Sequence, residues 1–351
     1  MKSYFRPEID AMEGYVPGEQ PKMANLVKLN TNENPFAPSP EVEKVLRNFS
    51  IERMRRYPDP RADGLRCAVA ERNKIQKENV IVGNGSDDIL TMIFRAFTSP
   101  DKPMAMLYPS YSLYAELAAM QGAEVIKIAL APKTFALPQD ILKQSERANL
   151  LMLTRPNAPT GNSFDMAVTE NICRNFDGIV VIDEAYADFA EDNCMELAKT
   201  LDNVIVMRTF SKSYALAGLR LGYAVGSLKI IEGLMKLKDS YNVDMLSQEI
   251  ALASYNDTGY FSQRVKEVKA MRSMLKSELE KLGFYCVDSQ SNFIFAMPPD
   301  GDGERCFTAL RNEAVIVRYF SSEPTKQYVR ITIGNEAENA RLLEVLRSVY
   351  N

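Results

Sequence analysis

The chain has 351 residues and a formal net charge of −4, with basic and acidic residues interspersed. This length allows a sizeable core and favours two domains, because single hydrophobic cores stop growing at roughly 250 to 300 residues. Without a basic excess or a polybasic tract, the chain is not expected to bind nucleic acid or an anionic membrane surface, so small molecules are the expected partners.

The numbers of cysteines and histidines limit which cellular compartment and which kinds of catalytic site can be expected. The five cysteines are scattered and form no C-x-x-C pair, which is typical of reduced thiols and predicts a cytoplasmic protein. No apolar run approaches the roughly 18 residues of a membrane span, and a charge or proline interrupts any signal-like core near the start. Histidine is absent, which excludes Ser-His-Asp and Cys-His nucleophile systems and histidine-ligated metal sites, so we expect no metal.

The first segment, residues 1–40, is rich in Pro, Asn and Glu. Its Tyr-Val-Pro-Gly and Asn-Thr-Asn-Glu-Asn-Pro stretches have no helical or strand period and are typical of turns in an extended chain. We therefore predict an N-terminal arm that packs with the smaller of the two domains.

From 41 to 240, predicted helices and strands alternate, which is typical of βαβ units. Helices are predicted at 41–49, at 64–76 and from Asp87 onward. Strands are predicted at 79–82, 104–107, 124–128, 150–154, 179–182, 204–207 and 222–225. This pattern predicts a large α/β domain with a mostly parallel central sheet wrapped by helices, and we expect this domain to hold the ligand site at the carboxyl ends of its strands.

The pattern changes after residue 240. A long charged helix is predicted near 259–282 and a final helix at 336–349, with alternating strands at 292–296, 314–318 and 328–333 between them. Strands and helices in this order predict a smaller α+β domain over 241–351.

The segment from Gly83 to Asp88 follows a predicted strand and opens a helix. Its backbone N–H groups and the positive end of the helix can hold a phosphate. The segment lacks the third glycine of the dinucleotide fingerprint and the Gly-Lys-Ser/Thr of a P-loop, so neither a nucleotide-binding oxidoreductase nor an ATP site is favoured. An ordinary βα turn with Ser or Asp at the helix N-cap is the alternative interpretation.

Three residues favour chemistry with pyridoxal phosphate (PLP). The apolar run before Asp183 predicts a buried parallel strand that delivers Asp183 and Tyr186 at its C-terminal end, where open α/β sheets bind ligands. Asp183 would keep the pyridine nitrogen of PLP protonated, and Tyr186 would donate to the phenolic oxygen. Lys212 would bond covalently to PLP and act as general base, because buried lysines shift their pKa readily. Taken singly, these residues also suit a turn cap, a half-buried ring and a surface charge.

Several motifs follow one another along the chain in a fixed order: Gly85-Ser86, Tyr111, Pro159-Thr160-Gly161, Asp183-Glu-Ala-Tyr186, Ser211-Lys212 and Gly218-Leu-Arg220-x-Gly222. This ordered series resembles the fold type I PLP-dependent aminotransferases. Four other segments, Leu29–Pro35, Arg56–Pro60, Pro109–Tyr114 and Tyr328–Gly334, are similar to the histidinol-phosphate aminotransferase branch. The resemblance runs over nearly the whole chain.

The resemblance implies a PLP-dependent aminotransferase of histidine biosynthesis that acts on histidinol phosphate and 2-oxoglutarate. Aromatic amino-acid aminotransferases and a threonine-phosphate decarboxylase share the same cofactor residues and stay open as alternatives. A non-catalytic PLP-binding module is less favoured, because a regulator of that kind needs a helix-turn-helix and the proline-rich arm is too short for one.

The resemblance also implies a role for each matching residue. Lys212 would bond to PLP, Asp183 would face the ring nitrogen, Tyr186 would face the phenolic oxygen, and Tyr111 would stack on the ring. The phosphate would be held by Ser86, Ser211 and Arg220, with Tyr57 contributed by the neighbouring subunit, and Gly85 and Asp87 would also belong to the cofactor site. This last assignment implies a homodimer with shared active sites. Tyr57 and Tyr111, which lie beside prolines, are alternatively ordinary loop tyrosines.

One position departs from the family pattern. The family has Asn directly before Pro-Thr-Gly, where it donates to the phenolic oxygen of PLP, whereas this chain has Asn157 followed by Ala158. Alanine cannot donate that bond. Either Asn157 takes the role or Tyr186 acts with a water molecule, and Asn157 alternatively only stabilises the turn.

The resemblance places three residues around the anionic end of the substrate: Tyr15, Arg318 and Arg330. A guanidinium fork suits a carboxylate or phosphate, and two arginines for one anion favour a dianion. For Arg318, a surface ion pair with a carboxylate is the alternative.

Overall fold

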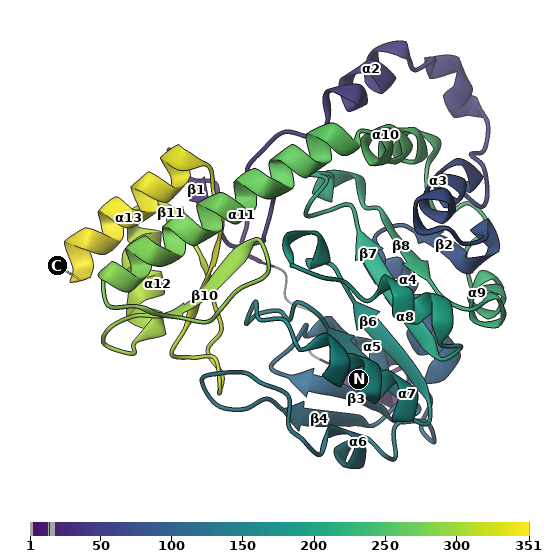
Figure 1. Cartoon of the computed structure of the whole chain (residues 1–351), viewed down its shortest axis with the longest axis horizontal. Helices are drawn as coiled ribbons and strands as arrows, with labels where there is room; N and C mark the ends of the chain where they lie inside the picture. The colour runs from purple at the N-terminus through teal and green to yellow at the C-terminus, as the bar shows by residue number, and fades with distance from the viewer. Residues whose placement is uncertain (1–2, 13, 15–17, 351) are drawn as a thin grey trace.

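A computed structural model describes residues 3–12, 14 and 18–350 of the chain (Figure 1). Its central feature is a seven-stranded sheet with the strand order β2-β8-β7-β6-β5-β3-β4. The strands are β2 (Val80–Gly83), β3 (Met104–Tyr108), β4 (Val125–Ala129), β5 (Leu150–Thr154), β6 (Ile179–Asp183), β7 (Val204–Thr209) and β8 (Gly222–Val225). Only β8 runs antiparallel to its neighbours, so the predicted mostly parallel sheet is confirmed.

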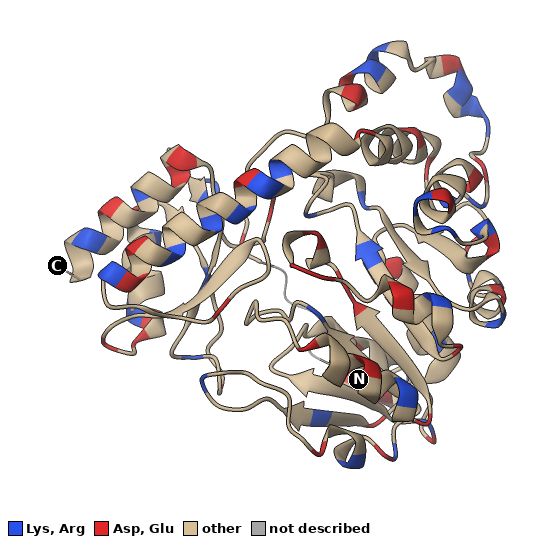
Figure 2. Ribbon diagram, viewed as in Figure 1, with Lys and Arg blue, Asp and Glu red and all other residues tan. Residues whose placement is uncertain are grey.

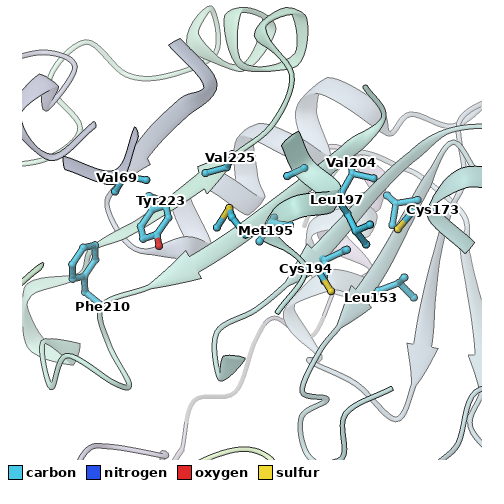
Figure 3. Close-up of a cluster of buried hydrophobic side chains, with 14 of the residues drawn as sticks. Val69, Leu153, Cys173, Cys194, Met195, Leu197, Val204, Phe210, Tyr223 and Val225 are labelled. Carbon is cyan, nitrogen blue, oxygen red and sulfur yellow. The ribbon is translucent and has the colours of Figure 1, made fainter. Parts of the chain in front are cut away.

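Helices cover both faces of this sheet, because alternate strand residues point to opposite sides. On one face, Val204 and Val206 of β7 pack with α3 (Asp63–Asn73), α7 (Met166–Asn175), α8 (Met195–Thr200) and α10 (Met245–Asn256). Figure 3 shows part of this cluster, with Val204 beside Leu197. On the other face, Ile205 and Met207 pack with α4 (Ser86–Phe97), α5 (Leu113–Met120) and α9 (Leu228–Met235).

The C-terminal region builds a second, four-stranded antiparallel sheet with the order β12-β13-β10-β9. The strands are β9 (Tyr285–Cys286), β10 (Phe293–Met297), β12 (Arg318–Tyr319) and β13 (Val329–Thr332). The core of this region also contains side chains from the long α11 (Thr258–Lys281), from α12 (Gly303–Asn312) and from α13 (Glu336–Tyr350). Figure 1 shows α11 running from α10, beside the large sheet, to the C-terminal helices.

The segment predicted as one strand at 314–318 is divided between two sheets. β11 (Val315–Ile316) pairs in parallel with β1 (Val27–Lys28) of the N-terminal arm, whereas β12 pairs with β13. The arm is thus hydrogen-bonded to the C-terminal region through the backbone N–H of Leu29, 2.7 Å from the carbonyl oxygen of Ile316. An earlier part of the arm, α1 (Pro7–Asp10), instead lies against α5 of the large domain.

The packing of α10 differs from the predicted domain boundary at 240/241. Ile250, Ala251 and Tyr255 of α10 are buried in the core of the large domain, and the helix packs against α2 (Pro40–Asn48). We therefore place the boundary at the start of α11. The sequence pattern did not predict α10 as a separate helix, because a single residue, Asp257, separates its end from the long charged helix that begins at Thr258.

The remaining short elements are α6 (Ile141–Gln144) and 3-10 turns at Ile51–Arg55, Lys77–Asn79, Ala187–Phe189 and Ala217–Leu219. Figure 2 shows that acidic and basic residues are mixed along the chain in both domains. Within the described part of the chain, no helix is long and apolar enough to cross a membrane. The same residues contain no cluster of three or more Cys, Asp or Glu side chains that could hold a metal ion.

Candidate active site

A cavity of about 510 Å³ lies where the C-terminal ends of β2, β3, β5, β6 and β7 face the C-terminal domain. Parallel strands present their carboxyl ends at one edge of a sheet, and this edge is where such folds bind ligands. The predicted site residues that line the cavity are Ser86, Asp87, Tyr111, Asp183, Tyr186, Ser211, Lys212, Arg220, Arg318 and Arg330. The tertiary structure therefore brings together residues that are up to 244 positions apart in the sequence.

Lys212 lies three residues beyond the end of β7 and points into the cavity. Its Nζ atom donates a hydrogen bond to the carbonyl oxygen of Thr31 at 2.9 Å and lies 5.9 Å from the centroid of the Tyr186 ring. Burial disfavours the charged ammonium, and the nearby Arg330 repels it, so the pKa of Lys212 is lowered to about 8. An amine with this pKa is available as nucleophile and base near neutral pH.

Asp183 is the last residue of β6 and forms part of the cavity floor. One carboxylate oxygen accepts a hydrogen bond from the Tyr114 hydroxyl at 2.6 Å, and the other accepts from the backbone N–H of Ala185 at 3.1 Å. Burial raises the pKa of Asp183 to about 6, and these two hydrogen bonds act in the opposite direction. No cationic side chain of the described residues pairs with this carboxylate, so its environment fits the protonated ring nitrogen of the predicted cofactor.

Tyr186 lies three residues beyond the end of β6 and lines the cavity. Its hydroxyl oxygen accepts a hydrogen bond from the side-chain amide of Asn32 at 2.8 Å. The ring contacts Phe293 edge-to-face, with the centroids 5.1 Å apart, and packs with Ala158 in a small buried cluster. These contacts fix the position of the phenol at the cavity wall.

One corner of the cavity is suited to a phosphate. Arg220 has a left-handed backbone (φ 52°) and pairs with Asp87 at 2.8 Å, and it also lies 3.4 Å from the Ser211 hydroxyl. A Cβ atom on Gly222 would lie only 2.6 Å from the backbone N of Ser86, so glycine lets β8 approach the start of α4. The first N–H groups of a helix have no intrahelical acceptor, and together with Arg220 they form a cradle for an anion.

Tyr111 lines the cavity next to this corner. Its hydroxyl lies 3.5 Å from a carboxylate oxygen of Asp87, and its ring meets the Tyr114 ring edge-to-face at 5.5 Å. The ring is half-buried, which leaves part of it available for contact with a planar ligand.

Arg318 and Arg330 reach the cavity from adjacent strands of the C-terminal sheet. They are directly opposite each other in the pairing of β12 with β13, and their guanidinium carbons lie 5.4 and 5.6 Å from the centroid of the same ring, Phe320. Like charges directly opposite in a sheet are destabilising. An anionic ligand between them would relieve this repulsion, and a dianion would do so best.

Three of the predicted site residues that the structure describes do not line the cavity. Asn157 is buried in its wall, where the side-chain amide donates to the carbonyl oxygen of Pro109 and to the Thr160 hydroxyl and accepts from Ser110. Ala158 faces the cavity in its place, which corrects the prediction that Asn157 contacts the cofactor: its hydrogen-bonding groups are used within the wall.

The other two are Gly85 and Tyr57. Gly85 caps α4 with φ 82° and lies behind Arg220, which a Cβ atom on Gly85 would meet at 2.8 Å. Tyr57 is 78% exposed and stacks on Tyr241, with the ring centroids 4.4 Å apart, outside the cavity. Tyr15 lies outside the described residues.

Several residues at the cavity were not predicted from the sequence. From the arm, a segment comprising residues 30–34 (the 30–34 segment) supplies Asn30, Thr31 and Asn32 to the cavity lining. The run of polar residues in this segment, which has no helical or strand period, was the one sequence feature that could have indicated its place in the site. Tyr114 and the half-buried Glu116 come from α5. Tyr111 lies just before this helix, and the edge-to-face contact of its ring with Tyr114 comes from folding and not from helical spacing.

Comparisons with known proteins agree with this arrangement. The family model "Aminotransferase class I and II" matches residues 24–346. Histidinol-phosphate aminotransferase 1 of Nostoc sp. is 39% identical over 350 residues, which are 99% of either chain. The histidinol-phosphate aminotransferase of Geotalea daltonii is 42% identical over 347 residues, which are 97% of this chain and 98% of that relative.

Solved structures share the fold. The histidinol-phosphate aminotransferase of Sinorhizobium meliloti, in complex with pyridoxal-5'-phosphate, matches with a TM-score of 0.88 and 23% identity over 99% of each chain. The L-threonine-O-3-phosphate decarboxylase of Porphyromonas gingivalis matches with a TM-score of 0.81 and 22% identity, covering 92% of this chain and 99% of that one. The fold is therefore common to transamination and decarboxylation.

Proposed function

Because this chain belongs to the class I and II aminotransferases, we propose that it transfers the amino group of histidinol phosphate to 2-oxoglutarate, with PLP as its cofactor. Relatives named histidinol-phosphate aminotransferase are 38–42% identical to the chain over nearly their whole length. One observation carries the proposal at the site: Lys212, Asp183 and Tyr186 of the large domain share a cavity with Arg318 and Arg330 of the small domain.

The cavity has a place for each part of the cofactor. Ser211, Arg220 and the backbone N–H groups at the start of α4 would hold the phosphate. The Asp183 carboxylate would accept a hydrogen bond from the protonated ring nitrogen, and the Tyr186 hydroxyl would donate one to the phenolic oxygen. When bound, PLP supplies an electron sink for the bond that breaks at the substrate α-carbon.

Lys212 is the residue that would bond to the cofactor and carry a proton. Its lowered pKa of about 8 gives an appreciable neutral fraction near pH 7, and only the neutral amine acts as nucleophile or base. The Thr31 carbonyl oxygen holds the amine on the cavity side at 2.9 Å. With no histidine in the chain, Lys212 is the cavity's best-placed group for moving a proton at the α-carbon.

The substrate end of the cavity supports a phosphorylated imidazole compound. Arg318 and Arg330 together suit the phosphate dianion of histidinol phosphate and the second carboxylate of 2-oxoglutarate. Glu116 also lines the cavity, and no described residue forms an ion pair or hydrogen bond with its carboxylate. This carboxylate offers an acceptor for an imidazole N–H, which a phenyl ring lacks.

We further propose a homodimer in which Tyr57 completes the neighbouring site. Tyr57 is 78% exposed and lies close in sequence to two exposed apolar residues, Ile51 (79%) and Met54 (58%). Exposed apolar groups gathered on one segment are typical of an interface. The cytoplasm is the proposed location, which is supported by five cysteines with free thiols.

Steady-state kinetics test the proposed reaction. The purified PLP-loaded protein should transaminate histidinol phosphate with a kcat/KM at least tenfold above that for phenylalanine, and it should release no CO2 from threonine phosphate. Lys212→Ala should lose both the activity and the visible absorption band of the bound cofactor. Negligible turnover of histidinol phosphate by protein that binds PLP would sink the substrate assignment and leave the cofactor assignment intact.

A further inference from the structure

Asn32, in the 30–34 segment, is buried at the cavity wall and its side chain is held at both ends. The residue is 1% exposed, and its backbone carbonyl oxygen accepts a hydrogen bond from the Asn292 amide at 3.0 Å. Its side-chain amide donates to the hydroxyl oxygen of Tyr186 at 2.8 Å. Asn32 therefore contacts a residue that is proposed to bind the cofactor.

The hydrogen bonds of Thr332 determine which way this amide points. The Thr332 hydroxyl oxygen accepts the backbone N–H of Asn32 at 3.0 Å, so its own hydrogen is available for the side-chain oxygen of Asn32, 3.3 Å away. With the oxygen turned to Thr332, the NH2 group faces Tyr186. Asn32 therefore acts as a donor and Tyr186 as the acceptor in this contact.

Ala158 makes this donor more important. Its methyl group packs with Tyr186 and Phe293 at the cavity wall, and the neighbouring Asn157 uses its amide on Pro109 and Thr160. The loop between β5 and α7 thus presents no side-chain amide to the phenol from this side. Asn32, from the arm, is the amide that reaches it.

We propose that Asn32 is a positioning residue that orients Tyr186 and strengthens its hydroxyl as a donor to the phenolic oxygen of PLP. This inference rests on the proposed cofactor role of Tyr186. A hydroxyl whose oxygen accepts a hydrogen bond is polarised and donates more strongly. Asn32 therefore favours the deprotonated phenolic oxygen and lowers the pH at which the cofactor's spectrum titrates.

Asn32→Gly is the variant that tests this role. The backbone of Asn32 is left-handed (φ 55°), so glycine keeps the conformation without strain and removes only the amide. The measured quantity is the pH midpoint of the visible absorption change of the PLP-loaded protein, which does not depend on turnover. We expect the midpoint to rise by on the order of a few tenths of a pH unit in Asn32→Gly.

A double-mutant cycle with Tyr186→Phe separates this role from a structural one. If Asn32 acts through the phenol oxygen, Asn32→Gly shifts the midpoint in the wild-type background and leaves it unchanged in the Tyr186→Phe background. An equal shift in both backgrounds, or no shift in either, would overturn the proposal. Wild-type protein without a visible band would instead refute PLP binding, and with it the proposed function.

Asn149→Ala is the matched control. Asn149 does not line the cavity, and its side-chain amide donates to the carbonyl oxygen of Phe97 at 2.7 Å, so its truncation should leave the midpoint unchanged. If Asn32→Gly does not fold, Asn32→Asp replaces it, because aspartate also tolerates positive φ. For Asn32→Asp, the measured quantity is the difference between its midpoint shifts in the wild-type and Tyr186→Phe backgrounds. The shift alone is not used, because the added negative charge changes the midpoint whether or not the Tyr186 hydroxyl is present.

Discussion

At the scale of single residues, the site buries ionisable groups whose charged forms are disfavoured by burial. Burial lowers the pKa of Lys212 to about 8 and raises that of Asp183 to about 6. Both shifts move the groups toward their neutral forms, in a cavity prepared for a charged ligand. The free protein is therefore less stable than its packing alone would make it, which is common where a site is organised in advance.

Lys212→Met should stabilise the PLP-free protein at neutral pH by about 1–3 kcal/mol. Below pH 8 the lysine is charged in both the folded and the unfolded chain, so the burial penalty is fully present. Between pH 8 and 10.5 only the unfolded chain holds the proton, and wild-type stability rises with pH. Denaturation midpoints at several pH values should show the advantage of Lys212→Met shrinking across this window; a difference independent of pH would contradict the lowered pKa.

Tyr114→Phe should raise the pKa of Asp183 further, because the carboxylate loses a hydrogen bond at 2.6 Å that favours its charged form. We expect the acid limb of the pH profile of kcat to move upward by about one pH unit. Tyr214→Phe is the control, since it removes a buried hydroxyl that contacts Arg72 outside the cavity. An unmoved acid limb in folded Tyr114→Phe would argue against this coupling.

At the scale of elements, the site depends on close approach between β8 and the start of α4. Gly222 opens β8, and its missing side chain leaves room for the backbone of Gly85 and Ser86. The 30–34 segment has a comparable role on the other side of the cavity. It accepts hydrogen bonds from Arg330 at Asn30 and from Lys212 at Thr31, and it donates to Tyr186 from Asn32.

Gly222→Ala should destabilise the protein by about 1–3 kcal/mol and weaken PLP binding, because its Cβ atom would lie 2.6 Å from the backbone N of Ser86. Gly226→Ala, at the far end of the same strand, is the control. Its Cβ atom would have no neighbour closer than 3.4 Å, and we expect a change within about 0.5 kcal/mol. Thermal unfolding and a PLP titration measure both effects, and equal behaviour of the two variants would refute the cradle.

At the scale of the whole molecule, the cavity lies between two domains that are packed together. Phe135 of the large domain contacts Phe295 and Tyr328 of the small domain, with ring centroids 5.8 and 5.7 Å away. The Tyr108 hydroxyl donates to the carbonyl oxygen of Glu323 across the cavity entrance at 2.7 Å. These contacts hold the arginines of one domain opposite the lysine of the other.

The proposed homodimer predicts complementation between two inactive variants. Lys212→Ala and Tyr57→Ala should each lose most activity alone. After the two are mixed, unfolded and refolded together, a mixed dimer has one site with both wild-type residues, because Lys212 comes from one subunit and Tyr57 from the other. Random pairing gives about a quarter of wild-type activity. No recovery, together with a monomeric mass in solution, would contradict shared sites.

Much of the fold was predictable because local sequence patterns report local structure. The buried strands β5, β6 and β7 are continuous apolar runs, and helices such as α11 and α13 have helical lengths and charged faces. The two-residue strands β1 and β11 were not predictable as a pair, since no local pattern tells a strand of that length which partner it meets. The same limit applies to α10, which only its packing assigns to the large domain.

The sequence by itself determined which residues are predicted to carry the chemistry. Lys212, Asp183 and Arg220 are marked by motifs next to strand ends, and the absence of histidine leaves few other candidates for a base. The tertiary structure decided how these groups are set: Tyr114 beside Asp183, Asn32 beside Tyr186, and Asn157 turned into the wall. Hydrogen bonds between residues 48 to 154 positions apart depend on distances that only the packed chain establishes, and one-dimensional patterns do not contain those distances.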